Sequence, residues 1–154
     1  MATISRLEQL IEHDDYWVIP LQGKAVTRCF VDSAFGLECW ERDSLTTIRI
    51  EGLFVFEEQG VEQHLSPEYP STLGPVLSVL GQTVTSAHAH KNGDLAVYFA
   101  NGSRLSVAPD AEYEAWEMVT SEGLRVVCTA GGNLSIWHAE RDSHKRPHDC
   151  KGEA

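Results

Sequence analysis

The sequence predicts a mainly β domain of the α+β class, with duplicated antiparallel β-meanders, a terminal three-strand unit and one or two short helices. Short runs of alternating apolar and polar residues, separated by glycine-containing turn dipeptides, indicate the strands. A repeated pattern indicates the duplication: Gly23-x-x-Val-Thr recurs as Gly81-x-x-Val-Thr, 58 residues further along the chain. We therefore expect an internal repeat over about residues 23–56 and 81–108.

The size and charge of the chain limit its organisation and its partners. It has 154 residues, with 12 Lys and Arg against 23 Asp and Glu, which gives a formal net charge of −11 at pH 7. This length suits a single domain, which we place at residues 1–139, followed by a flexible tail at 140–154 that has no apolar periodicity. The acidic balance argues against binding to nucleic-acid phosphates or anionic membranes, which both attract clustered Lys and Arg.

No targeting or membrane-spanning signal is evident in the sequence. Glu8 and Glu12 interrupt any apolar signal-peptide core, and no run approaches the ~20 apolar residues of a membrane span. These features predict a cytoplasmic protein that needs no cofactor. Four scattered cysteines are too few for a disulfide framework, although a Cys29–Cys39 bridge across a hairpin stays an alternative.

Two segments have helical spacing of apolar residues. The first is residues 5–13, where Ser5-x-x-Glu8 can form a capping box. The second lies at 71–80, with Pro75 acceptable only in its first turn. An α-helix there would bury one face made of four apolar residues: Leu73, Val76, Leu77 and Leu80.

The strands of the two predicted copies follow the period-two alternation. A short extended segment at 16–20 precedes them. The first copy is expected at 24–32, 35–41 and 46–56, and the second at 82–90, 94–100 and 103–108. Asn92-Gly93 and Asn101-Gly102 are the strongest hairpin signals. Three further strands begin at Trp116, Leu124 and Leu134.

The closing segment carries the most distinctive motif of the chain. Trp116-Glu, then Gly123-Leu-Arg-Val-Val-Cys, then Gly131-Gly-x-Leu-x-Ile-Trp resembles the signature of a small bacterial family of unknown function. The resemblance covers roughly residues 20–137 and brings no activity with it. A looser similarity of pattern links the chain to β-rich immunity proteins of bacterial toxin systems, and it implies no particular site.

His88 and His90 are the candidates for a metal site. Their spacing places two imidazoles on one face of a strand, which can chelate a metal if a third ligand joins them, such as Asp32, Glu38 or His64. Such a pair more commonly lies at a partly exposed strand end that binds no metal. A second group has metal-compatible residue types in the tail: His144, His148 and Cys150.

Signals for nucleophilic catalysis or phosphate binding are weak. Ser103 follows a plain turn rather than a nucleophile elbow. Cys128 lies in an apolar strand, where burial would raise the thiol pKa and reduce its reactivity. Gly131-Gly132 precedes a strand and not a helix, so it is not a phosphate-binding loop.

An acidic run beside two aromatic residues is the candidate partner-binding site. Charge runs usually form solvated loops, but this one combines carboxylates with residue types that anchor interfaces. Its predicted contact residues are Asp110, Glu112, Tyr113, Glu114, Trp116 and Glu117. Trp116 and Trp137 have a core role as an alternative, which we favour for Trp137.

These observations favour a non-enzymatic acidic binding or inhibitor protein whose partner is a protein with a basic surface. An immunity-type protein that neutralises a toxin is one form of this hypothesis. The alternatives are a small metal-binding or hydrolytic enzyme using His88, His90 and nearby carboxylates, and a homo-oligomeric structural module.

Overall fold

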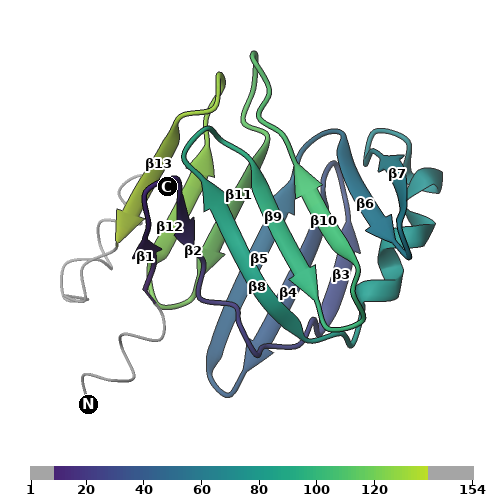
Figure 1. The fold of residues 1–154 in the computed structure, drawn as a ribbon, viewed down its shortest axis with the longest axis horizontal. Coiled ribbons are helices and arrows are strands. Elements are labelled where there is room, and N and C mark those ends of the chain that lie inside the picture. The colour runs from purple at the N-terminus through teal and green to yellow at the C-terminus, as the bar shows by residue number, and fades with distance from the viewer. Residues whose placement is uncertain (1–8, 139–154) are drawn as a thin grey trace.

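The computed structural model describes residues 9–138 as two antiparallel β-sheets and one 3₁₀ helix (Figure 1). The seven-stranded sheet has the order β1-β2-β8-β9-β10-β6-β7. Its strands are β1 (Ile11–Glu12), β2 (Tyr16–Val18), β8 (Val84–His90), β9 (Leu95–Phe99), β10 (Arg104–Val107), β6 (Phe54–Glu58) and β7 (Val61–Leu65).

The six-stranded sheet has the order β13-β12-β11-β5-β4-β3. Its strands are β13 (Leu134–His138), β12 (Leu124–Cys128), β11 (Trp116–Thr120), β5 (Ser44–Ile50), β4 (Phe35–Glu41) and β3 (Arg28–Val31). One continuous core of buried side chains, drawn from both sheets, lies between them and includes Phe35, Ile48, Phe56 and Leu105. The mainly β class is confirmed, and the two layers form a sandwich.

The two Gly-x-x-Val-Thr segments pair with each other at one end of the sandwich. The amide of Gly23 donates to the carbonyl of Val84 at 2.8 Å, and the amide of Gly81 donates to that of Val26 at 2.8 Å. Gly81 follows Gly23 by 58 residues and Val84 follows Val26 by the same number, so exchanging the two copies turns one bond into the other, with Ala25 facing its counterpart Thr83. The repeated sequence therefore lies around a local two-fold relation.

Each copy exchanges strands with the other. The first copy places β3, β4 and β5 in the six-stranded sheet, and the chain then crosses to the other sheet, where β6 pairs with β10. The second copy places β8, β9 and β10 in the seven-stranded sheet, and the chain then crosses back, where β11 pairs with β5. The first crossover occupies residues 51–53 and the second residues 108–115. The second crossover is therefore longer, and it carries the acidic run.

Three expectations about individual elements are wrong. Residues 1–8 lie outside the described part, but 9–13 form no helix: Ile11 pairs with Val18 in a strand. The single strand expected at 46–56 is two strands in different sheets, β5 and β6. The sequence analysis also missed β7, because its mostly exposed and polar residues show no clear alternation of apolar and polar positions. This strand follows a tight turn with positive φ at Gln59 and Gly60.

The helix at Pro70–Val79 is a 3₁₀ helix rather than an α-helix, and this changes its buried face. Three residues per turn align Leu73, Val76 and Val79, which are the buried positions. Leu77 and Leu80, which an α-helix would have buried, are exposed by 46% and 55%. Pro75 lies inside this helix and favours its departure from α geometry. No helix within residues 9–138 has the length and apolar character needed to cross a bilayer.

The tips of two hairpins from opposite sheets touch through their backbones. A Cβ added at Gly132, in the β12–β13 turn, would lie 2.6 Å from the Asn92 carbonyl oxygen in the β8–β9 turn. Gly93 is equally confined, because a Cβ there would lie 2.8 Å from the Gly132 Cα. Only glycine fits this contact, and both residues have positive φ.

We expect Gly132→Ala to destabilise the protein by about 1–3 kcal/mol more than Gly102→Ala, measured by urea unfolding. Both glycines have positive φ, at 99° and 90°, so the backbone strain of alanine is similar. An alanine Cβ at Gly102 meets nothing within 4 Å, and this control isolates the contact between the hairpins. Equal losses in the two variants would show that the hairpin contact contributes nothing.

Candidate functional site

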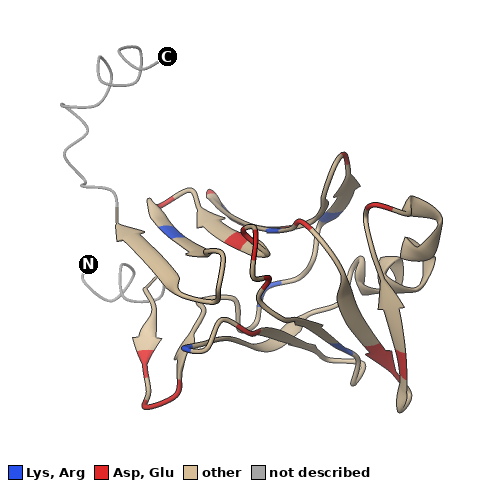
Figure 2. Cartoon of the chain, turned by 90° about the horizontal axis from the view of Figure 1, so that it is seen from above, with Lys and Arg blue, Asp and Glu red and all other residues tan. Residues whose placement is uncertain are grey.

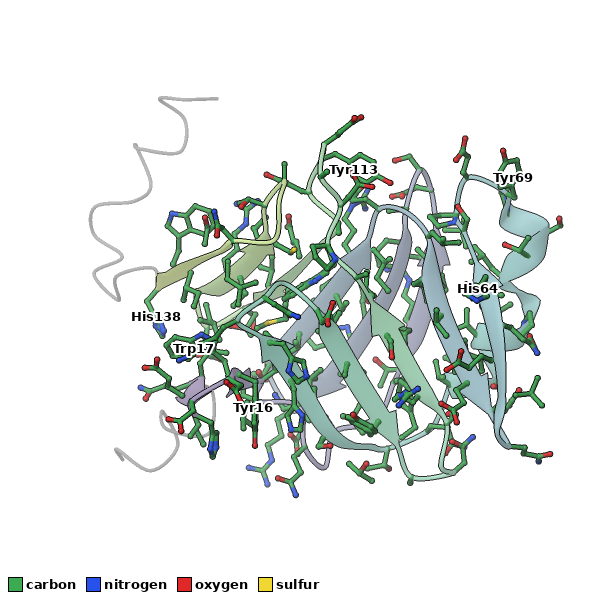
Figure 3. The ribbon with its side chains drawn as sticks, turned by 45° about the horizontal axis from the view of Figure 1, so that its top comes forward. Tyr16, Trp17, His64, Tyr69, Tyr113 and His138 are labelled. Atoms are coloured by element: carbon green, nitrogen blue, oxygen red, sulfur yellow. The ribbon has the colours of Figure 1, made fainter. Side chains whose placement is uncertain are left out.

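The two crossovers run side by side and form the candidate site. The amide of Glu51, in the first crossover, donates to the carbonyl of Ala115, in the second, at 2.9 Å. The Tyr113 hydroxyl lies over Gly52, only 2.5 Å from the position that a Cβ there would take. Figure 3 shows Tyr113 on the projecting loop of the second crossover, with its ring outside the core. The longer loop is therefore fixed against the shorter one.

An open depression of about 880 Å³ lies beside these crossovers. Its walls come from the β3–β4 turn, both crossovers and the segment that follows β7. The lining residues are Ser33, Glu51, Pro67, Glu68, Tyr113 and Glu114. A smaller hollow of about 150 Å³ adjoins it, lined by Gly52, Leu53, Ala108, Pro109, Asp110, Tyr113 and Ala115.

The charge of the depression is negative and only partly neutralised. The guanidinium of Arg49 contacts Glu51 at 3.0 Å and Asp32 at 3.1 Å. Within residues 9–138, no ion pair neutralises Glu68 or Glu114. The depression therefore presents carboxylates to solvent and suits a positively charged occupant.

The pKa values of two groups at the site reflect these neighbours. The hydrogen bond from Arg49 holds the pKa of Asp32 below its ordinary value. Burial raises the pKa of Tyr113, and the Asp110 side chain, which accepts from its hydroxyl, raises it further. The nearby carboxylates of Glu68 and Glu112 act in the same direction. Tyr113 thus stays protonated and can donate a hydrogen bond at neutral pH.

The structure brings together only part of the predicted acidic site. Tyr113 and Glu114 line the depression, and Asp110 lines the adjoining hollow. Glu112 is exposed on the same loop, where its amide donates to the Asp110 carboxylate at 2.8 Å. Glu117 is directed elsewhere: it forms an ion pair with Arg125 at 3.2 Å on the outer face of the six-stranded sheet. Figure 2 shows acidic residues on several loops and on the hairpin next to the helix, so the site holds a portion of the surplus negative charge.

The two tryptophans exchange the roles expected of them. Trp116 is fully buried, and its indole Nε1–H donates to the Gly93 carbonyl at 2.9 Å, so it cannot contact a partner. The alternative that Trp116 belongs to the hydrophobic core is therefore confirmed. Trp137 is 51% exposed on edge strand β13, with the Arg125 guanidinium 5.4 Å from its ring centroid. The core role that we favoured for Trp137 is wrong, because within residues 9–138 β13 is an edge strand and Trp137 lies beside the partly exposed Arg125 on its partner strand.

His88 and His90 share the outer face of β8, as their spacing predicts, and they contact aromatic rings. Their ring centroids are 6.1 Å apart, and the ring of Tyr16 lies 4.5 Å from His88. On its other side, Tyr16 stacks on His13 at 4.8 Å. Burial lowers the pKa of His88, and the neighbouring His90 and His13 lower it further.

The proposed third metal ligands do not join this pair. Asp32 and Glu38 belong to the other sheet or its turns, and His64 lies on β7, at the far edge of the same sheet from Tyr16 (Figure 3). Residues 9–138 contain no group of three or more His, Cys, Asp or Glu that could hold a metal ion. The tail candidates His144, His148 and Cys150 lie outside the described residues, as does the expected flexible tail at 140–154.

The cysteines within residues 9–138 are free thiols in buried or partly buried positions. Burial raises the pKa of Cys39 to about 12 and also raises that of Cys128. The alternative of a Cys29–Cys39 bridge is not what the structure shows.

Sequence reasoning missed Glu51, Glu68, Ser33 and Pro67 as lining residues. Glu51 lies inside the single strand expected at 46–56 and the others lie in turns, so their local patterns resemble those of ordinary surface residues. The signal that the sequence does contain is the acidic run, which lies in the segment that the structure shows to be the longer crossover.

Comparison with known proteins finds one family. Residues 17–138 match the sequence model described as "Family of unknown function (DUF6188)". No curated protein and no solved structure matches the chain.

Replacing Trp116 with Phe should destabilise the protein by about 1–3 kcal/mol, because it leaves the buried Gly93 carbonyl without its indole donor. Trp137→Phe is the matched control: that ring is half exposed, and its replacement should change the free energy of unfolding by at most about 0.5 kcal/mol. Urea unfolding of both variants measures the difference. A loss for Trp116→Phe no larger than that of the control would contradict the role of this hydrogen bond.

The lowered pKa of His88 predicts a loss of stability on acidification. Below the ordinary histidine pKa of 6.5 the unfolded chain binds a proton that folded His88 resists. The contribution of neutral His88 to the free energy of unfolding is therefore fully present above pH 6.5, and it is lost as the pH falls below this value. His88→Phe, which keeps a ring against Tyr16, should reduce this decline, measured as urea midpoints between about pH 7.5 and 5.5. His64→Phe, at an exposed position of β7, should leave it unchanged; an unaltered decline in His88→Phe would count against His88 as its source.

Proposed function

The chain belongs to a family of unknown function, and from the geometry of its crossovers we propose that it is a non-enzymatic binding protein whose acidic depression holds a basic segment of a protein partner. The observation that carries this proposal is the meeting of Glu51, Glu68 and Glu114 around one open depression, with no Lys or Arg among its lining residues. These three residues come from separate segments, so the folded chain gathers a charge that the acidic run alone does not supply.

The exposure of these carboxylates favours binding over acid–base catalysis. Catalytic carboxyl groups are usually tuned by burial or by close pairing with another carboxylate. Glu51, Glu68 and Glu114 are all exposed, and Glu51 is engaged by Arg49. An open, charged surface beside an exposed tyrosine has the composition of a polar protein interface, where complementary charge speeds association.

The partner class follows from the sign of the charge. Positively charged side chains of a protein are complementary to the depression, whereas nucleic-acid phosphates and anionic lipids would be repelled. An immunity-type role, in which the partner is a basic toxin domain or enzyme, is one form of this proposal. Tight association with such a domain encoded beside this gene, measured with both proteins purified, would support that form, and failure to associate would remove it.

Removing charge from the depression should weaken binding of a basic probe. The probe is a blocked, fluorescently labelled peptide, Arg-Gly-Ser-Arg-Gly-Ser-Arg, with a Gln-for-Arg peptide as the uncharged control. We expect the double variant Glu68→Gln/Glu114→Gln to raise the Kd about three- to tenfold, measured by fluorescence polarisation at low salt. Added salt should weaken the wild-type complex, because the interacting charges are exposed.

The matched control is Glu41→Gln/Glu122→Gln, which removes the same charge at the opposite end of the six-stranded sheet. This pair should change the Kd less than twofold. Equal weakening in both double variants would mean that the probe senses only the net charge of the protein, and it would overturn the assignment to the depression.

A further inference from the structure

Tyr113 forms a wall that two adjoining hollows share. One is the acidic depression of about 880 Å³, and the other is the hollow of about 150 Å³ beside Leu53 and Pro109. Tyr113 is 48% exposed, so an occupant of either hollow can reach it. A ligand that spans both hollows would therefore contact the same ring twice.

The position of Tyr113 is fixed by the residues beneath it. Gly52 has no side chain, and the Tyr113 hydroxyl occupies the space that a Cβ would need. The Asp110 carboxylate accepts from this hydroxyl and is itself held by the Glu112 amide at 2.8 Å. A ring held in this way is a preorganised contact surface, which reduces the entropy lost when a partner binds.

The smaller hollow differs from the depression in its chemistry. Five of its seven lining residues are Gly, Ala, Leu or Pro, and the others are Asp110 and Tyr113. Leu53 is 60% exposed at its rim, so a partner side chain there would remove apolar surface from water. A cavity of about 150 Å³ holds a benzene-sized group in an engineered protein, so one leucine-sized side chain suits this volume.

We propose that the site recognises an arginine followed or preceded closely by a leucine-sized apolar residue in an extended partner segment. This inference rests on the proposed function, and it adds the sequence class of the ligand. The guanidinium lies among Glu51, Glu68 and Glu114, with its aliphatic stem along the Tyr113 ring. The apolar side chain enters the smaller hollow against Leu53. Arginine suits this site better than lysine, because a planar guanidinium both stacks on an aromatic ring and pairs with carboxylates.

The test uses a defined set of blocked peptides, Gly-Ser-X-X-X-Ser-Gly, in which the three central positions hold Arg, Leu and Gly in every order. Matched peptides replace Leu with Gly or Arg with Gln. The protein variant is Ala108→Leu, which fills the smaller hollow without altering a carboxylate. Its control is Ala100→Leu, at an exposed alanine in the β9–β10 turn, which lies at the opposite end of β10 from Ala108.

We expect at least one Arg/Leu order to bind about tenfold tighter than its Leu-to-Gly counterpart, by fluorescence polarisation. Ala108→Leu should remove this advantage, and Ala100→Leu should preserve it. Urea unfolding of Ala108→Leu checks that the fold is retained, and Ala108→Ser, which does not fill the hollow, should keep the preference for leucine.

The outcomes separate the two proposals. If Glu68→Gln/Glu114→Gln weakens all Arg peptides but no order shows a leucine advantage, the inference is overturned and the proposed function stands. If Arg and Gln peptides bind alike, the proposed function fails, and the inference fails with it. If the protein self-associates in sedimentation and Ala108→Leu abolishes this, a second copy of the chain is the occupant, which also overturns the inference.

Discussion

The buried hydrogen bond from Trp116 to the Gly93 carbonyl connects the two sheets at the end where the chain crosses between them. Trp116 begins β11 in one sheet, and Gly93 lies at a hairpin tip of the other. The contact between Gly93 and Gly132 keeps these tips close enough for the bond to form. Because a buried carbonyl without a donor is costly, the start of β11, and with it the end of the acidic crossover, is fixed by this arrangement.

The two-fold relation of the repeat explains why the site lies where it does. Strand exchange requires each copy to cross from one sheet to the other, and the symmetry brings both crossovers to the same end of the sandwich. At the equivalent place in the first copy, Phe54 stacks on Phe35 at 5.6 Å between ring centroids, where the second copy has Trp116 and Gly93. The longer second crossover breaks the symmetry and adds Tyr113 and Glu114 to the site. The candidate site therefore lies where the two crossovers differ in length.

The closing sequence motif, which resembled a family signature, now has a physical explanation. Its Trp116 and Gly132 both contact the Asn92–Gly93 turn of the other sheet, so these two residues of the motif join the sheets. The acidic loop before this motif is held at its end by Trp116, and its acidic side chains lie outside the core.

The sequence by itself determined the β class, most of the strand boundaries and the repeated Gly-x-x-Val-Thr pattern, because alternation and turn glycines are local properties of the chain. It also located the acidic run and predicted that His88 and His90 share a face. Only the tertiary structure decided that 46–56 divides between two sheets, that Leu77 and Leu80 face solvent, and that Trp116 is buried while Trp137 is not. It alone gathered Glu51, Glu68 and Glu114 around one depression, because these residues are distant in sequence and their proximity arises from the exchange of strands. No local sequence pattern predicts that the two crossovers lie side by side.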